Sequence, residues 1–349
     1  MEHHWWYRFR KNKPAVAGGF FLLVCSFFAA FAYLLIPDKS IDANEQHLQL
    51  IALKPGSEQY FLMPDRPYST AWHWFFTGKN PKEQPIPISH LSVKGDSMTY
   101  IVQGTSLKQS ETMLVKDGYR LVKRTYWLGT DILGRDLWSR LVLGLRVSLS
   151  VGLIAVVISL LVGVCLGAIA GYFRGWVDLC VGWLINVIWS IPSLLLVIAF
   201  SLVMGKGMWQ VFLAVGLTMW VDVARIVRGQ VLALREQEFV IAAQAMGFGH
   251  VRVIVHHILP NVVGPIVIMS ASNFATAILV ESGLSFLGLG VQPPVASLGM
   301  MIKEHYPYII MDAAYLAMVP GVLILLLVLA FNLFGNGLSD AFDSKLKIN

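Results

Sequence analysis

Residue patterns that support covalent chemistry are absent from this sequence. It has no Gly-x-x-x-x-Gly-Lys-Ser/Thr loop, and the nearest fragments, Gly78-Lys79-Asn80 and Gly205-Lys206-Gly207, lack its spacing and its magnesium-binding hydroxyl. It also has no Gly-x-Ser-x-Gly elbow and no His-Glu-x-x-His pair, and the adjacent His256 and His257 would point in different directions from a helix. We therefore predict no catalytic residue, no metal site and no cofactor bound by this chain, ATP included.

A different kind of pattern lies between Glu238 and Asn261, in a loop between two apolar segments. Ala242 and Ala243 fall in a short predicted helix, 239–246, where small side chains let another surface approach the backbone closely. Gly247 supplies the left-handed conformation that ends a helix. The pattern predicts a short helix followed by a tight turn.

A second helix is expected over Val251–Leu259, and Pro260 lies where the next membrane helix begins. Proline is tolerated in a first helical turn because its missing N–H would have no partner there. The loop 235–260 is thus predicted to be a rigid helix-turn-helix knob. It either transmits movement from a cytoplasmic partner or rests at the membrane interface without one.

Polar side chains in or beside apolar segments are costly and usually face protein or water, and four of them are candidates for a functional role. They are Asn186, Asp222, Asn273 and Glu281. We take them as candidates for lining or gating a pathway. Asp222 lies three residues before Arg225, so a local ion pair is expected there.

The elements that position these residues follow from composition. Of 349 residues, 56% are hydrophobic and 14% are charged, against roughly 25% charged in an average soluble domain. This deficit excludes a disordered chain, a coiled coil and an ordinary cytosolic enzyme. The three cysteines lie in or beside apolar runs, which indicates packing rather than disulfides or zinc.

We predict an all-α membrane protein with six transmembrane helices, since a span needs about 20 apolar residues. The first is too long for a signal peptide and is expected to be retained. Pro192, Pro265 and Pro320 each interrupt a span. The predicted spans are 18–36, 147–173, 179–205, 207–221 extending to about 227, 258–280 and 313–339.

Orientation follows from Lys and Arg in short loops. With a cytoplasmic N-terminus, the short outer loops contain only Lys206 and Lys303, and both termini are cytoplasmic. The net charge of +6 then reflects topology and lipid headgroups, so no nucleic-acid partner is expected. The basic residues on the cytoplasmic side are Arg8, Arg10, Lys11, Lys13, Arg174, Arg225, Arg228, Arg235, Arg252, Lys345 and Lys347.

The outer segment between the first two spans differs in composition from the rest of the chain. Residues 37–125 are polar, and Ser89–Gln103 predicts a hairpin with Lys94-Gly95-Asp96 at its turn. A further strand is possible over Tyr119–Thr125. This small, possibly β-rich insertion is either an embellishment or a docking surface for a soluble partner.

The knob resembles the "EAA" loop of ABC-importer permeases, in which this loop docks on the ATPase subunit. The resemblance rests on Ala242-Ala243, Gly247 and Leu259-Pro260, with Pro260 thirteen residues after Gly247. Ile241 stands at the usual Glu position and His257 at the usual Ile position. The polar contact that the Glu makes is therefore in doubt here.

Three further stretches are similar to the "C"-type permease of the dipeptide, oligopeptide and nickel branch, which has a MetI-like transmembrane domain. They are Leu128–Leu149, Trp220–Gly229 and Leu284–Gly299, and the resemblance covers about 126–343. Within the first, Gly129-Thr130-Asp131 and Gly134-Arg135-Asp136 form either a capped, salt-bridged turn or a flap that contacts a binding protein.

The resemblance implies three parts: 1–36 as N-terminus and first span, 37–125 as the insertion, and 126–343 as a five-helix permease core. It implies a second permease subunit, two ATPase subunits that bind ATP and Mg, an extracytoplasmic binding protein and a bacterial or archaeal plasma membrane. Substrate identity does not follow from it. The alternative function is a self-contained secondary transporter or channel, which predicts an internal repeat that we do not find.

Overall fold

The computed structural model describes residues 4–64, 78, 85–94, 97–104, 110–114, 119–205, 207–311 and 313–342. The chain divides into two compact units. The first unit consists of residues 1–26, 148–292 and 321–349, and the second of residues 27–147 and 293–320. The chain passes between them within helices α2 (Lys13–Ala30), α5 (Leu137–Phe173) and α13 (Tyr315–Phe342).

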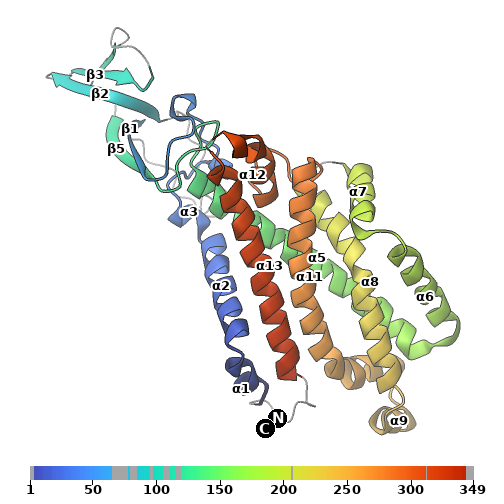
Figure 1. Cartoon of the computed structure of the whole chain (residues 1–349). Coiled ribbons are helices and arrows are strands. Elements are labelled where there is room, and N and C mark those ends of the chain that lie inside the picture. The colour runs from blue at the N-terminus through green and yellow to red at the C-terminus, as the bar shows by residue number, and fades with distance from the viewer. Residues whose placement is uncertain are drawn as a thin grey trace. The chain divides into compact units, whose positions relative to one another are not determined.

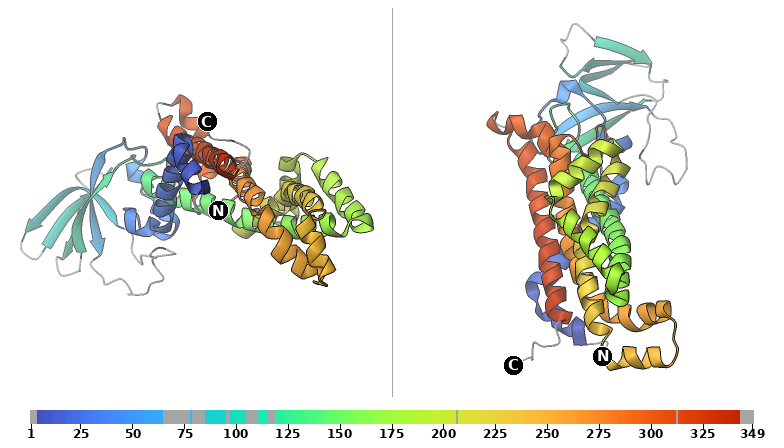
Figure 2. Two further views of the ribbon diagram at one scale, coloured as in Figure 1. Left: turned by 90° about the horizontal axis from the view of Figure 1, so that it is seen from below. Right: turned by 90° about the vertical axis from the view of Figure 1, so that its right-hand side faces the viewer.

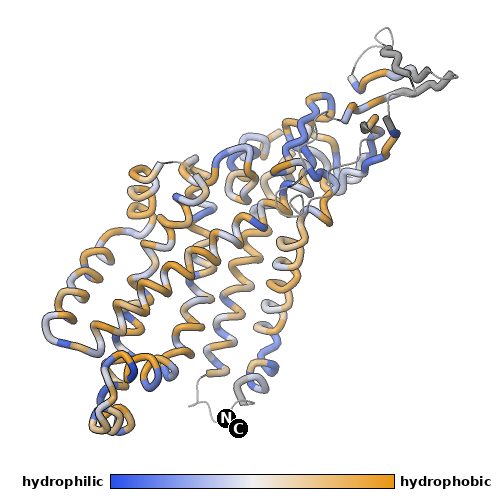
Figure 3. Tube along the Cα trace, turned by 180° about the vertical axis from the view of Figure 1, so that it is seen from behind, coloured by the Kyte–Doolittle hydropathy of each residue, from blue (hydrophilic) through white to orange (hydrophobic). Residues whose placement is uncertain are grey.

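Long apolar helices dominate the first unit (Figures 1 and 3). Besides α2, α5 and α13 they include α8 (Met208–Leu234) and α11 (Leu259–Leu287). Within the described residues, five helices are long and apolar enough to cross a membrane, with α11 counted together with the turns that precede it. Pro265 and Pro320 lie inside α11 and α13 without ending either helix.

The expected third span, 179–205, is not one helix. It is divided between α6 (Gly175–Trp189) and α7 (Ser193–Met204), which are bent by 92° relative to each other. Pro192 explains the break, because proline lacks an N–H and disfavours helical backbone at the residue before it. Among the described residues the predicted six spans are therefore five single helices and, if it is one span, this bent pair.

Close packing of α5 on α8 depends on three glycines spaced four residues apart. A Cβ added to Gly163, Gly167 or Gly171 would lie 2.7, 2.6 or 2.8 Å, respectively, from a backbone oxygen of α8. Small residues at this spacing let helix backbones approach in a membrane. Helix α8 also packs against α11, α7 and α6.

The remaining short elements of the first unit lie at the ends of its long helices. They are α1 (His4–Lys11), α9 (Glu238–Ala245), α10 (His250–Arg252) and a π-helical turn (Val253–Ile258). Figure 2 shows α9 projecting at the end of this unit where α1 and the C-terminal end of α13 also lie. The knob and both terminal helices are therefore at the same end.

The second unit contains a five-stranded antiparallel sheet in the order β4-β3-β2-β1-β5. In the stretch expected to form a hairpin, β2 pairs with β3, and Gly95 and Asp96 of the expected turn lie outside the described residues. The strands are β1 (Ser57–Pro64), β2 (Ile86–Lys94), β3 (Ser97–Val102), β4 (Ser110–Leu114) and β5 (Tyr119–Tyr126).

Successive residues of β1 enter two different cores, as the two-residue period of a strand requires. Phe61 packs with Leu50 and Tyr126. Leu62 packs with a separate cluster that includes Ile88 and Tyr100. Short helices complete the unit: α3 (Ala32–Leu35), α12 (Leu298–His305) and the 3-10 turns Ile41–Ala43, Leu48–Leu50 and Tyr306–Ile310.

Replacing Gly167 by leucine should destabilise the first unit, because the new side chain would meet the α8 backbone. Overpacking of this kind costs about 1–3 kcal/mol. A thermal unfolding midpoint lowered by several degrees in detergent is expected. Gly229→Leu in α8 is the control, because a Cβ there has no atom within 4 Å. Equal midpoints for the two variants would refute the close-packing role.

Candidate functional site

The predicted knob, 235–260, contains α9, α10 and the π-helical turn, which together span residues 238–258. Helix α9 ends as the sequence predicts: Gly247 has φ +79°, in the left-handed region. Its N–H donates to the Gln244 carbonyl (2.9 Å), and the Phe248 N–H donates to the Ala243 carbonyl (3.2 Å). These two bonds satisfy carbonyls at the helix end and fix the turn.

One side of the knob is part of the core of the first unit. Val240 and Ala243 are 0% and 1% exposed, and they belong to a buried cluster with Tyr172 of α5 and Val227 and Val231 of α8. Of the two alanines that the sequence analysis singled out, Ala243 therefore packs the knob against the core, whereas Ala242 is exposed. The small size of Ala243 lets α9 lie close to the ends of α5 and α8.

The other side of the knob is apolar and exposed. Phe239 is 43% exposed, Ile241 54%, Met246 67% and Val251 75%. These residues belong to α9, the turn after it and α10, and large exposed apolar patches mark protein or membrane interaction sites. Ile241, which stands where the family has Glu, is one of them, so this position offers an apolar contact instead of a polar one.

The knob continues directly into α11. The second knob helix is short: α10 covers only His250–Arg252, and a π-helical turn follows over Val253–Ile258. Leu259 and Pro260 begin α11, and Pro260 lies in its first turn, as expected. No loop therefore intervenes between the knob and α11.

Polar contacts also hold the knob against the end of α5. The hydroxyl of Tyr172 lies 3.0 Å from Nδ1 of His250 and accepts a hydrogen bond from the Gln244 side-chain amide (3.2 Å). Beside it, the Arg174 guanidinium pairs with the Glu236 carboxylate at 2.5 Å. The sequence pattern did not identify Tyr172 or Gln244, because their partners are distant along the chain.

A groove of about 650 Å³ lies between α6 and α8. Its lining includes Asp178, Arg228 and Arg225 together with the rings of Trp183 and Trp189. Asp178 and Arg228 are ion-paired, with 2.9 Å between Oδ2 and Nη2. This mixture of charged and aromatic side chains differs from the mainly apolar surface of α7.

Of the four candidate pathway residues, only Asn186 lines this groove, and it is exposed. Asp222 is half-buried. The prediction of an ion pair between Asp222 and Arg225 is wrong, because no such pair forms among the described residues. The Arg225 guanidinium carbon instead lies 3.4 Å from the centroid of the Trp189 ring.

Glu281 and Asn273 lie inside the first unit. Glu281 is fully buried, and the hydroxyls of Ser148 (3.0 Å) and Ser285 (2.7 Å) donate to its two carboxyl oxygens. Asn273 is 4% exposed, and its side-chain amide nitrogen has no hydrogen-bond partner among the described residues. Both positions are internal, so neither offers a polar surface to a solute in this conformation.

A buried ionic cluster in the second unit contains the two Gly-flanked acidic and basic motifs. Asp131 accepts hydrogen bonds from the backbone N–H groups of Leu133 (2.8 Å) and Arg135 (2.9 Å) and from Nε of Arg135 (2.5 Å). The capped, salt-bridged turn is therefore present. Contact of this turn with a binding protein stays a prediction.

The same cluster brings Asp131, Glu304 and His305 close enough to contact one cation. Two guanidinium groups already occupy this region: Arg135 lies 2.7 Å and Arg140 3.4 Å from Glu304. Two positive charges balance the two carboxylates, so the cluster has no net negative charge to attract a metal ion. We assign no metal to it.

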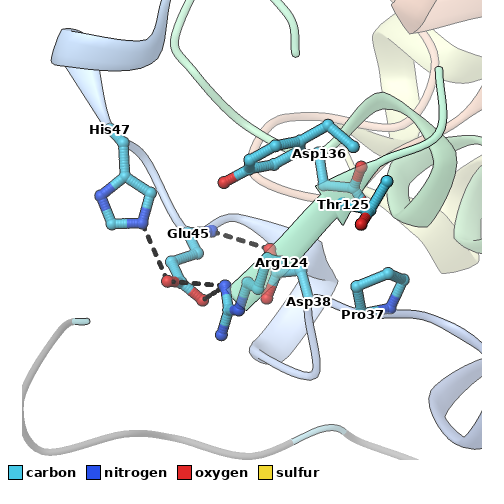
Figure 4. A pocket seen from close by; sticks show the side chains of 8 residues that line it. Pro37, Asp38, Glu45, His47, Arg124, Thr125 and Asp136 are labelled. Carbon is cyan, nitrogen blue, oxygen red and sulfur yellow. Dashed lines mark hydrogen bonds and ion pairs between the residues drawn. The ribbon is translucent and has the colours of Figure 1, made fainter. Parts of the chain in front are cut away.

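A small polar pocket lies next to this cluster in the second unit (Figure 4). Its volume of about 10 Å³ is near that of one water. Glu45 binds His47 (2.8 Å) and Arg124 (3.0 Å) on one side of it. The other lining residues are Pro37, Asp38, Thr125, Tyr126 and Asp136.

Asp136 has the most unusual environment of these residues. It precedes α5, and its Oδ2 accepts hydrogen bonds from the Ser139 N–H (3.1 Å) and hydroxyl, whereas Oδ1 has no partner among the described residues. Burial raises the pKa of Asp136 to about 6. Burial alone would also raise the pKa of Glu45, but His47 and Arg124 lower it overall.

Asp136 should make stability fall as pH rises from about 4 to about 6. The folded state retains its proton over this window, whereas an unfolded carboxyl near its ordinary value of 3.8 has lost it. Asp136→Asn should therefore gain unfolding temperature relative to the wild type between pH 4 and pH 7. Asp340→Asn, at an exposed position, is the control. A constant difference across pH would contradict the prediction.

Comparison with known proteins identifies the family. The family model "Binding-protein-dependent transport system inner membrane component" matches residues 163–348, and "N-terminal TM domain of oligopeptide transport permease C" matches residues 3–55. The chain is 36% identical over 286 residues to the dipeptide transport system permease protein DppC of Alkalihalophilus pseudofirmus, covering 81% of this chain and 94% of the relative.

Two further relatives show similar agreement. The glutathione transport system permease protein GsiD of Pectobacterium atrosepticum is 40% identical over 64% of this chain and 73% of the relative. The oligopeptide transport system permease protein OppC of Bacillus subtilis is 40% identical over the same shares. The chain belongs to the family of binding-protein-dependent inner-membrane transport components, the permease subunits of ABC importers.

Proposed function

We propose that this permease imports peptides or a similar small solute across a bacterial inner membrane. The names of its relatives, which are permeases for dipeptides, oligopeptides and glutathione, support this substrate class. The proposed complex contains a homologous second permease, two ATPase subunits that bind ATP and Mg, and an extracytoplasmic binding protein. A self-contained transporter is disfavoured, because the exposed apolar side of the knob would then have no partner to bind.

One observation carries the coupling role: the knob is fixed on one side and apolar on the other. Val240 and Ala243 are buried against α5 and α8, whereas Met246 and Val251 are mostly exposed. Desolvated apolar anchors dominate binding energy at protein interfaces. A rigid knob with such anchors is suited to a groove on an ATPase subunit.

Movement would pass from the knob into the membrane helices. When ATP closes the ATPase subunits, the docked knob is displaced, and α11 moves with it because the π-helical turn joins them directly. Helices α5 and α8 follow through the buried cluster under α9. Such rigid-body gating between two arrangements would expose the pathway alternately to the two sides of the membrane.

The same proposal sets the orientation of the chain. In the first unit, α1, the C-terminal end of α13 and α9 lie at one end (Figure 2). If α9 meets the cytoplasmic ATPase, both termini are cytoplasmic, in agreement with the distribution of Lys and Arg. The strands of residues 57–126 would then be extracytoplasmic.

Gly247→Val tests the turn on which the shape of the knob depends. A β-branched residue at φ +79° is strained, so α9 should lose its position. We expect transport to fall at least about tenfold and ATPase association to weaken. Gly249→Val is a matched control, because Gly249 has φ −62° and a Cβ there meets no atom within 4 Å. Unchanged transport in Gly247→Val would overturn the coupling role.

Met246→Asp tests the exposed apolar side without altering the fold. A charge at an interface anchor should weaken co-purification of the ATPase subunits by about tenfold or more, with unchanged thermal stability. Gln230→Asp, at an exposed position of α8, controls for the added charge. Full association of Met246→Asp would refute the role of Met246 as an anchor, whereas ATP-independent uptake by the purified chain alone would argue for a self-contained transporter.

A further inference from the structure

Arg225 lies in α8, a helix long and apolar enough to cross a membrane. Helix α8 has 27 residues and is about 40 Å long, longer than a hydrocarbon core of about 30 Å. Arg225 is about 14 Å along the axis from the last residue of α8. Charged groups at such positions face protein, a partner subunit or water rather than lipid tails.

The charges of the groove leave Arg225 uncompensated. The groove contains one carboxylate, Asp178, and two guanidinium groups, Arg225 and Arg228. Asp178 is paired with Arg228. Arg225 has no carboxylate partner among the residues that the structure describes, and the groove therefore has a net positive charge at this point.

Aromatic contact holds the Arg225 side chain in place. Its guanidinium carbon lies over the Trp189 ring, 3.4 Å from the ring centroid, a contact worth roughly 0.5–2 kcal/mol. Stacking on a ring leaves the N–H groups at the guanidinium edge able to donate. Such a fork binds a carboxylate with two parallel hydrogen bonds.

We propose that the groove between α6 and α8 forms part of the wall of the solute pathway, where Arg225, held by Trp189, binds a carboxylate of the passing solute. This inference rests on the proposed function, since peptides carry a free carboxylate. The groove volume of about 650 Å³ is within the usual range for a small-ligand site. Asn186 lies on the same wall and adds a neutral polar contact.

A thiol-labelling experiment tests the charge and the water access without any substrate. Gly182 lines the groove and has open space around it, so Gly182→Cys is placed in a complex whose Cys25, Cys165 and Cys180 are replaced by alanine. The anionic reagent MTSES should react roughly fivefold faster than cationic MTSET. Arg225→Gln should abolish this preference, and Arg225→Lys should retain it.

Labelling by a membrane-permeant maleimide but by neither charged reagent would overturn the inference, because the groove would then face lipid. Equal MTSES preference with and without Arg225 would also overturn it. Either result leaves uptake by the wild-type complex intact, so it is distinguishable from failure of the proposed function.

Uptake by the reconstituted complex tests the carboxylate contact. With radiolabelled alanyl-alanine or glutathione, Arg225→Gln should lower kcat/KM at least about tenfold, Arg225→Lys should recover most of it, and the solute should slow MTSES labelling only when Arg225 is present. Lys11→Gln, which removes a cation over the Tyr7 ring in α1 (4.7 Å), is the control. Uptake that is unaffected in Arg225→Gln would refute the contact, whereas a wild type that imports neither probe would refute the peptide assignment instead.

Discussion

The close approach of α5 to α8 is the constraint on which the position of the knob depends. Three glycines let the α5 backbone lie against α8. The end of α5 then places Tyr172 against the buried side of the knob. Tyr172 contacts the knob both through the buried cluster and through its hydroxyl. Without that approach, Gly247 would still end α9, but α9 would lose the packed ends of α5 and α8 that support it. The position of the knob therefore depends on helix packing as well as on its own turn.

Local features were predictable from the sequence, and features that join distant residues were not. Gly247 ends α9 because a glycine after a short helical run has one dominant structural role. The apolar runs likewise located the long helices. In contrast, Pro192 indicated an interruption but not a 92° bend. The spacing of Asp222 and Arg225 suggested an ion pair, yet Trp189, on another helix, takes Arg225 instead. Glu281 meets Ser148, which is 133 residues away, and no local pattern contains that pairing.

Polar groups serve three separate purposes in this chain. Glu281 and its serine partners are an internal hydrogen-bonded set in the bundle. Asp131, Arg135, Arg140 and Glu304 are a charge-balanced cluster that organises the turn before α5. The groove around Arg225 is the exception, because its charges do not balance within the chain. The formal charges at each location show the difference. Polar groups that pair within the chain stabilise the fold, whereas the charge of Arg225, unpaired among the described residues, is available to a ligand.

The bend between α6 and α7 has a consequence for how the subunit is made. Irregular backbone at membrane depth is tolerated only where protein or water covers it, and many large side chains around this bend, such as Trp183 and Trp189, are exposed on the isolated chain. A newly inserted copy that has not met its partner would present this unprotected break to the bilayer. Coverage of the bend by water or by another molecule is therefore a step in the maturation of this span.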